Sequence, residues 1–276
     1  MSQEYSYAIA VGKKDEERLK VLNNLYNPVS LEFLKDMGIQ KGMKVLDLGC
    51  GSGIMSSEIA KLISKNGKVI ALDINEKQLE IEKKITKIHG AENVEFCYLS
   101  AYDFSKLEKN SFDAVFCRFL LMHVQNADLI LENIKKILKP NGKLILIETL
   151  GDYSITCYPS FKEFEEFIEL GVKQFQLQKS DSSIGYKLPE ILKSHGFNVS
   201  DIRFFHPVLK TPFEKKLFRL DVESLTDAIS KEKIESRKKL QTIQKALTRI
   251  ENNDNYVATY YEVALVGAVK PKDIQK

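Results

Sequence analysis

The chain has 276 residues, enough for one large domain or for a domain that carries an insertion. Hydrophobic residues make up 43% of it, which indicates a folded protein with a sizeable core and argues against disorder. The net charge of +3 is close to neutral at this length and gives no reason to expect a nucleic-acid partner.

Neither a membrane segment nor a metal site is expected. No apolar run approaches the roughly 18 residues of a membrane helix, and the N-terminus lacks the apolar stretch of a signal peptide. The four cysteines and four histidines are scattered, without a Cys-x-x-Cys pair or another metal-ligand spacing. We therefore expect a cytoplasmic protein with reduced thiols, no membrane partner and no metal.

The N-terminal region is charged and apolar at helical spacing. Leucines recur through residues 13–38, and Pro28 interrupts the pattern. This pattern predicts two helices that precede the first strand.

The most informative segment runs from Val45 to Gly53. A short apolar strand, at about 44–48, leads into glycines at 49, 51 and 53, and a helix is expected over 54–65. Glycine allows positive φ and lets a ligand lie against bare main chain, and the helix N-terminus would turn amide groups toward that ligand. A dinucleotide fingerprint would need glycine at position 54, where this chain has Ile54, so a nicotinamide oxidoreductase is disfavoured.

A second strand, at about 68–73, ends in Asp73 and precedes a helix at about 75–89. A carboxylate at that place can accept both hydroxyls of a ribose lying across the first turn, whereas an N-cap role for Asp73 is the alternative. With VLDLGCGSG before it, the chain resembles the class I S-adenosylmethionine-dependent methyltransferases, of a bacterial small-molecule type. The resemblance implies that the cofactor is bound by the first turn and by the end of the second strand, through Asp47, Gly49, Cys50, Gly51, Gly53, Asp73 and Ile74.

The third strand, at about 93–98, is followed by Ser100, Ala101 and Tyr102. The resembled family usually presents an acidic residue and then a small one to the adenine here, so Ser100 is a departure. Asp103 is one substitute, and Ala101 backbone with packing alone is another. Tyr102 could stack on the ring.

The fourth strand, at about 112–117, leads into Arg118 and Phe119, whose carbonyls the resemblance places near the methionine part of the cofactor. His123 is a candidate general base, although a packed or capping histidine is the more frequent role. Glu148 and Tyr153 complete the candidate catalytic set. The chain lacks the Asn/Asp-Pro-Pro-aromatic run typical of methyltransferases that act on nucleic-acid bases or on protein glutamine.

The remaining pattern alternates less regularly. A helix at about 126–138, a turn at Lys139-Pro140-Asn141-Gly142 and a strand at about 143–149 complete the repeating unit. A Phe-rich stripe at helical spacing follows, and it is either core packing or the lining of an acceptor pocket. It consists of Phe161, Phe164, Phe167, Ile168 and Phe175. The later expectations are helices at 161–178 and 187–195, a strand at 198–206, one or two helices within 213–251, and a strand at 260–269.

These elements predict an α/β fold with a Rossmann-like seven-stranded sheet, mostly parallel with an antiparallel last strand, helices on both faces and a helical cap. The expected organisation is an N-terminal segment that closes the site, a cofactor-binding core, a cap that includes the sixth strand, and a last strand with its tail, over 1–40, 41–150, 151–258 and 259–276. Tyr7 and Arg18 are candidates to close the site over the cofactor.

The expected function is methyl transfer from S-adenosyl-L-methionine to a small-molecule acceptor, with S-adenosyl-L-homocysteine as product, by a monomer or homodimer. Two alternatives stay open. One is a cofactor-binding protein of this fold without turnover, and the other is an RNA or protein methyltransferase.

Overall fold

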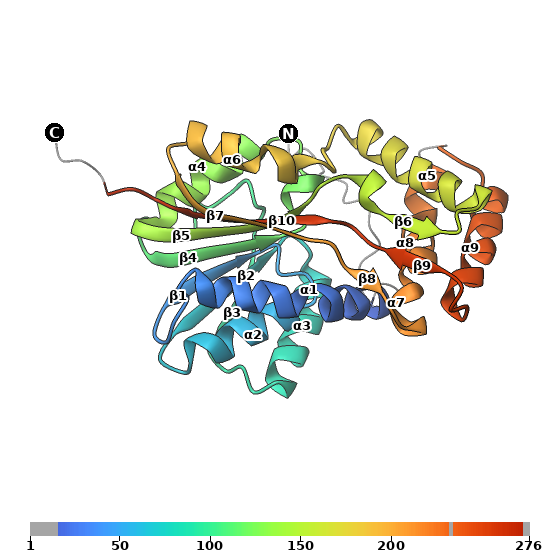
Figure 1. Cartoon of the computed structure of the whole chain (residues 1–276). Helices are drawn as coiled ribbons and strands as arrows, with labels where there is room; N and C mark the ends of the chain where they lie inside the picture. The colour runs from blue at the N-terminus through green and yellow to red at the C-terminus, as the bar shows by residue number, and fades with distance from the viewer. Residues whose placement is uncertain (1–15, 232–233, 273–276) are drawn as a thin grey trace.

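The computed structural model describes residues 16–231 and 234–272 and contains a seven-stranded sheet in the order β3-β2-β1-β4-β5-β10-β7 (Figure 1). The first five strands run parallel, and β10 is antiparallel to both β5 and β7. The expected sheet with its antiparallel last strand is confirmed. The strands are β1 (Lys44–Leu48), β2 (Lys68–Asp73), β3 (Val94–Tyr98), β4 (Phe112–Arg118), β5 (Leu138–Thr149), β7 (Asn198–Phe205) and β10 (Val263–Val269).

Helices cover both faces of this sheet (Figure 1). Residues of α1 (Glu16–Asp36) and α2 (Ile54–Ile63) pack with one set of strand side chains, and residues of α4 (Ala127–Ile137) and α6 (Ile184–Ser194) pack with the other. The helix α3 (Glu76–Ile88) lies against α2, β2 and β3. Because successive strand residues point to opposite faces, the long apolar strands supply both cores.

The N-terminal region forms one helix, so the expected break at Pro28 is wrong. The helix α1 continues through Pro28, which is exposed to solvent. Tyr26, Phe33 and Leu34 are fully buried on the opposite side, against the sheet and the cap. This burial outweighs the lost hydrogen bond of one proline, because tertiary packing supplies most of the stability of a helix.

Two strand boundaries also differ from expectation. The segment Lys139–Gly142 lies within β5, where a register shift opposite Phe112 and Ala114 and a positive φ at Asn141 accommodate the turn residues. The last strand, expected at 260–269, begins only at Val263 as β10, and a separate short strand that was not expected, β9 (Val257–Thr259), precedes it.

A second layer lies beyond the ends of β4 and β5 (Figure 1). It contains a three-stranded sheet, β6-β9-β8, that the sequence did not predict, with β6 at Thr156–Tyr158 and β8 at Val208–Leu209. Its helices are α5 (Lys162–Gln178), α7 (Pro212–Lys215), α8 (Leu217–Lys231) and α9 (Arg237–Glu251). We call residues 156–178 and 207–259 the cap.

The Phe-rich stripe of α5 is mostly core of this cap. The ring centroids of Phe164 and Phe167 lie 5.3 Å and 5.8 Å from that of Phe218 on α8, and all three side chains are buried. Core packing is therefore the role of this part of the stripe.

Among the described helices, none is long and apolar enough to cross a membrane.

Replacing Pro28 with alanine should stabilise the protein. Alanine restores an N–H donor in the middle of α1, and the gain should exceed the small entropic benefit that proline gives through the unfolded chain. We expect the free energy of unfolding to rise by about 1–3 kcal/mol in urea titrations. The control Glu32→Ala, at another exposed position of α1, should change it by less than about 0.5 kcal/mol. A lower stability of Pro28→Ala would contradict this account of α1.

Candidate active site

The turn after β1 is held against the end of β2. The amides of Gly49 and Cys50 both donate to the carbonyl oxygen of Leu72, at 2.8 Å and 3.1 Å. Gly49, Gly51 and Gly53 have φ values of +74°, +57° and +67°, a region in which a side chain is strained. The three glycines thus allow a turn that brings bare main chain to the carboxyl ends of the strands.

Gly51 faces open space. A Cβ built there would meet no atom closer than the carbonyl oxygen of Gly49, at 4.0 Å, whereas one at Gly49 would lie 3.3 Å from Leu120. The positive φ and the open surface at Gly51 are what a ligand needs in order to lie on the backbone. A cradle for S-adenosylmethionine therefore fits this turn.

Asp73 lies beside that cradle at the end of β2. One carboxylate oxygen accepts from the Gly51 amide at 3.2 Å, and the other accepts from the Asn75 amide at 3.0 Å. Burial raises the pKa of Asp73, and the hydrogen bonds from Asn75, Gly51 and Ile74 oppose that rise. Asp73 thus binds both the glycine turn and the segment that leads into α3. The next residue, Ile74, has 42% of its surface exposed.

Asp47 is buried beneath the turn on β1. Its carboxylate accepts a hydrogen bond from the Ser56 hydroxyl of α2. Burial raises the pKa of Asp47 to about 6, and the Ser56 bond and the charge of Arg118 oppose the rise. Asp47 therefore connects β1 to the first turn of α2 through this hydrogen bond.

The loop after β3 is tied to the loop before α4. The Tyr102 hydroxyl accepts from the amides of Gln125 and Asn126, at 3.2 Å and 3.3 Å, and the Ser100 hydroxyl accepts from the Tyr102 amide at 3.2 Å. Ala101 between them is half-buried. The structure brings this loop to the strand ends, beside Asp73, through the bond from the Leu99 amide to the Asp73 carbonyl.

Glu148 organises the turn after β4. It is fully buried, and its carboxylate accepts from the amides of Leu120, Leu121 and Met122, at 3.0 Å, 2.8 Å and 3.2 Å. Burial raises the pKa of Glu148 to about 7, although the three amide bonds oppose the rise. The turn so fixed includes Phe119 in a strained conformation at φ +55° and continues into the short helix η2 (Leu121–His123).

His123 lies at the end of η2 and stacks on Phe175 of α5, with ring centroids 5.6 Å apart and planes 15° from parallel. Burial lowers the pKa of His123 to about 4, and the positive charge of Arg18 lowers it further. The imidazole is therefore neutral at pH 7 and lies where the core meets the cap. Phe175 is the one residue of the Phe-rich stripe whose described ring contact is with a candidate site residue.

Arg18 joins α1 to the cap. Its guanidinium lies 3.5 Å from the carboxylate of Asp221 on α8, and the same carboxylate accepts from the Tyr260 hydroxyl at 2.7 Å. Tyr153, in the short helix η3 (Asp152–Ser154) that follows β5, is 77% exposed. Tyr7 lies outside the described residues.

Sequence reasoning missed the partners of Arg118. Its guanidinium binds side chains of α1 rather than presenting itself to solvent, through Asn23, Asn27 and Ser30. The available signal was polar residues spaced four and three apart on the helix face that also carries buried Tyr26 and Phe33.

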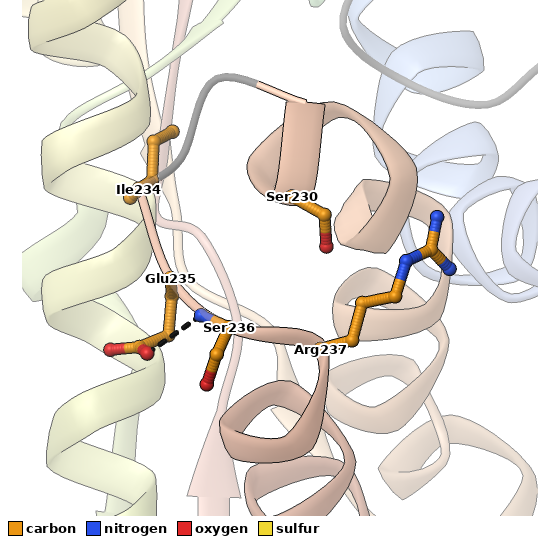
Figure 2. A pocket seen from close by; sticks show the side chains of 5 residues that line it. All are labelled: Ser230, Ile234, Glu235, Ser236 and Arg237. Atoms are coloured by element: carbon orange, nitrogen blue, oxygen red, sulfur yellow. Dashed lines mark hydrogen bonds between the residues drawn. The ribbon is translucent and has the colours of Figure 1, made fainter.

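A hollow lies away from these residues, at the turn between α8 and α9 (Figure 2). None of its lining residues belongs to the glycine turn or to the strand ends, and the hollow is wide open to solvent. Its lining residues are Ser230, Ile234, Glu235, Ser236 and Arg237.

Within the described residues no cluster of histidines, cysteines or carboxylates could hold a metal, and all four cysteines are free thiols.

Comparison with known proteins agrees with this geometry. Residues 39–184, more than half of the chain, match the family model described as a methyltransferase domain. A demethylmenaquinone methyltransferase of Staphylococcus aureus is 35% identical over 152 residues, which is 52% of this chain and 60% of that protein. The enzyme of the same name from Lactococcus lactis is 33% identical over 175 residues, 59% of this chain and 69% of that protein.

Solved structures share the fold. A candidate methyltransferase from Bacillus halodurans superposes with a TM-score of 0.60 at 22% identity, covering 88% of this chain and 100% of its own. A SAM-dependent methyltransferase from Aquifex aeolicus superposes with a TM-score of 0.55 at 17% identity, covering 94% of this chain and 99% of its own. At these identities the likeness concerns the fold.

The family match and the sheet order lead to one assignment, and they confirm the expected methyltransferase family and fold. The chain belongs to the methyltransferase domain family and has the fold of the S-adenosylmethionine-dependent methyltransferases.

Proposed function

We propose that this protein transfers a methyl group from S-adenosylmethionine to a small-molecule acceptor that binds between the sheet and the cap. The observation that carries the proposal is the open backbone of Gly51 beside the Asp73 carboxylate, at the carboxyl ends of the strands. Open α/β sheets bind their ligands at this end. The names of the curated relatives support a small molecule as acceptor.

The residues that would hold the cofactor follow from their places. Gly49, Cys50, Gly51 and Gly53 would supply the backbone surface, and Asp73 would accept the ribose hydroxyls. Ile74, Ser100, Ala101 and Tyr102 would border the adenine, and the carbonyls of Arg118 and Phe119 would face the methionine part. When bound, S-adenosylmethionine would supply an electrophilic methyl group for in-line displacement by the acceptor, with S-adenosylhomocysteine as the leaving group.

That displacement needs orientation and exclusion of water more than a strong acid or base. We propose that the cap together with α1 supplies both, because Arg18 of α1 reaches Asp221 of the cap. The N-terminal segment, including Tyr7, would complete the closure. The protein would act in the cytoplasm as a monomer or homodimer, and its free thiols agree with a reducing compartment.

The three candidate catalytic residues differ in what their positions allow. His123 lies at the border of core and cap and is neutral, so it is the candidate that could accept a proton from an acceptor, and its lowered pKa makes it a weak base. Glu148 is engaged by three amides, and we propose that it positions the turn rather than touching the acceptor. Tyr153 follows β5 and is exposed to solvent, so it is available to an acceptor but is not held in place by burial.

Asp73→Ala tests the cofactor site. The purified protein should bind S-adenosylhomocysteine in calorimetry and should move label from methyl-labelled S-adenosylmethionine into a small-molecule extract. The variant should bind more weakly by about 1.5–3 kcal/mol, because charge-assisted hydrogen bonds are lost. In the control Asp113→Ala, the lost carboxylate accepts a hydrogen bond from the Lys44 amide at the amino ends of β1 and β4, far from the proposed site. This variant should bind S-adenosylhomocysteine as tightly as the wild type. Two outcomes would contradict the proposed function. In one, label enters only RNA or protein, and in the other the protein binds S-adenosylhomocysteine but transfers no label.

Gly51→Ala tests the cradle, with Gly90→Ala as its matched control. Both glycines have positive φ, +57° and +69°, and at both a Cβ meets no close atom, so the backbone strain should be similar. Only Gly51 faces the proposed cofactor. Both variants should lose about 1 kcal/mol of stability, whereas only Gly51→Ala should bind S-adenosylhomocysteine at least tenfold more weakly. Equal affinities of the two variants would place the cofactor elsewhere.

Glu148→Gln tests the electrostatics of the buried carboxyl. Burial raises the pKa of Glu148 from 4.5 to about 7, so the folded protein holds its proton more tightly than the unfolded chain does. The resulting stabilisation is complete below pH 4.5 and is lost as the pH rises through about 7. The wild type should therefore lose up to about 3 kcal/mol more than the variant over that window, in urea titrations at several pH values. Parallel pH profiles would mean that Glu148 does not titrate there.

A further inference from the structure

The side chain of Arg118 binds one face of α1. One terminal nitrogen donates to the Asn27 side-chain oxygen at 2.9 Å and to the Ser30 hydroxyl at 3.1 Å, and the other donates to the Asn23 side-chain oxygen at 3.0 Å. Residues spaced four and three apart lie on the same face of a helix, so a single guanidinium reaches all three. The planar fork of arginine suits this arrangement, whereas a lysine ammonium could not reproduce it.

One of these partners continues to the glycine turn. The Asn23 side-chain nitrogen donates to the Ser52 hydroxyl at 2.9 Å, and Ser52 lies between Gly51 and Gly53. The described side-chain bonds of Asn27 join it to Arg118 alone. Asn23 therefore links the end of β4 with the turn after β1, and Asn27 holds the same cation without that link.

The environment favours a fixed, charged Arg118. Burial lowers the pKa of Arg118 to about 10, and the nearby charge of Asp47 opposes this effect, so the side chain stays charged at neutral pH. Arg118 is half-buried, and its three acceptors on α1 hold the guanidinium against that helix and offset its partial removal from water. A fixed cation can in turn fix the Asn23 amide that it binds.

We propose that Arg118 is a positioning residue for the cofactor, which acts through Asn23 on Ser52 and thereby fixes the glycine turn between Gly49 and Gly53. This role rests on the proposed function and adds to it a contribution of the Arg118 side chain, separate from the expected contact of its carbonyl. It also makes α1 part of the cofactor site.

The test compares Asn23→Leu with Asn27→Leu, since each removes one acceptor of Arg118 and only the first breaks the link to Ser52. Asn23→Asp is the conservative variant, because its carboxylate can accept from both Arg118 and the Ser52 hydroxyl. Two quantities are measured: hydrogen exchange of the Gly53 amide in the ligand-free protein, and affinity for S-adenosylhomocysteine. The Gly53 amide donates to the Cys50 carbonyl within the turn, so its exchange reports on the order of the turn.

Asn23→Leu should accelerate exchange at Gly53 and weaken S-adenosylhomocysteine binding, each by about tenfold, whereas Asn27→Leu should stay within about twofold of the wild type. Asn23→Asp should recover most of the affinity. Arg118→Lys should resemble Asn23→Leu, and combining the two should add little further loss, since both break one chain of contacts.

Equal effects of the two asparagine variants would show that Arg118 only holds α1, and would overturn the proposal. Additive losses in the double variant would do the same. If the wild type fails to bind S-adenosylhomocysteine, the proposed function fails, while the exchange measurement still decides whether Asn23 orders the turn.

Discussion

The site depends on the way in which the turn after β1 is bound to the end of β2. Two successive amides of the turn, those of Gly49 and Cys50, share the carbonyl oxygen of Leu72, and the next amide binds the Asp73 carboxylate. These bonds require positive φ at the glycines, because the chain must reverse direction without placing side chains between itself and β2. They fix the distance between bare main chain and Asp73, so a bound cofactor would meet a preformed surface.

Around that surface the protein buries charges and supplies each with partners. Asp47 is bound by Ser56, and Glu148 is bound by three amides of the turn after β4. Burial raises the pKa of both carboxyls and lowers the pKa of Arg118, so in each case removal from water is the dominant effect. Such groups add little net stability, and their value lies in fixing particular contacts. At Glu148 an apolar replacement would leave three backbone amides without that acceptor.

The parts of this fold that were predictable are those with a local cause. The strands β1 and β2 and the turn between β1 and α2 follow from apolar runs and from glycines whose conformation few other residues adopt. The helix through Pro28 was missed because burial of Tyr26 and Phe33, a tertiary effect, outweighs the local preference. The strands β6, β8 and β9 are too short, at two or three residues, to show a period in the sequence.

The candidate site divides in the same way. Asp73 was chosen for its place at a strand end, which sequence spacing specifies, and its side chain is found beside Gly51. The partners of Arg118 could not be chosen, since they lie 88 to 95 residues away in the chain and only the docking of α1 brings them together. Polar residues on the buried face of a helix indicate that the helix makes polar contacts. They do not indicate which residue of the rest of the chain is contacted.

The helix α1 therefore has a larger part in the site than its position before the core suggests. Near its start, Arg18 binds Asp221 of the cap and influences His123, and in its middle Asn23 binds both Arg118 and Ser52. One rigid helix thus contacts the cap at one point and the glycine turn at another. Any change in the position of α1 would therefore alter its contacts with the cap and with the glycine turn together, and the polar residues on its buried face are the ones that make these contacts.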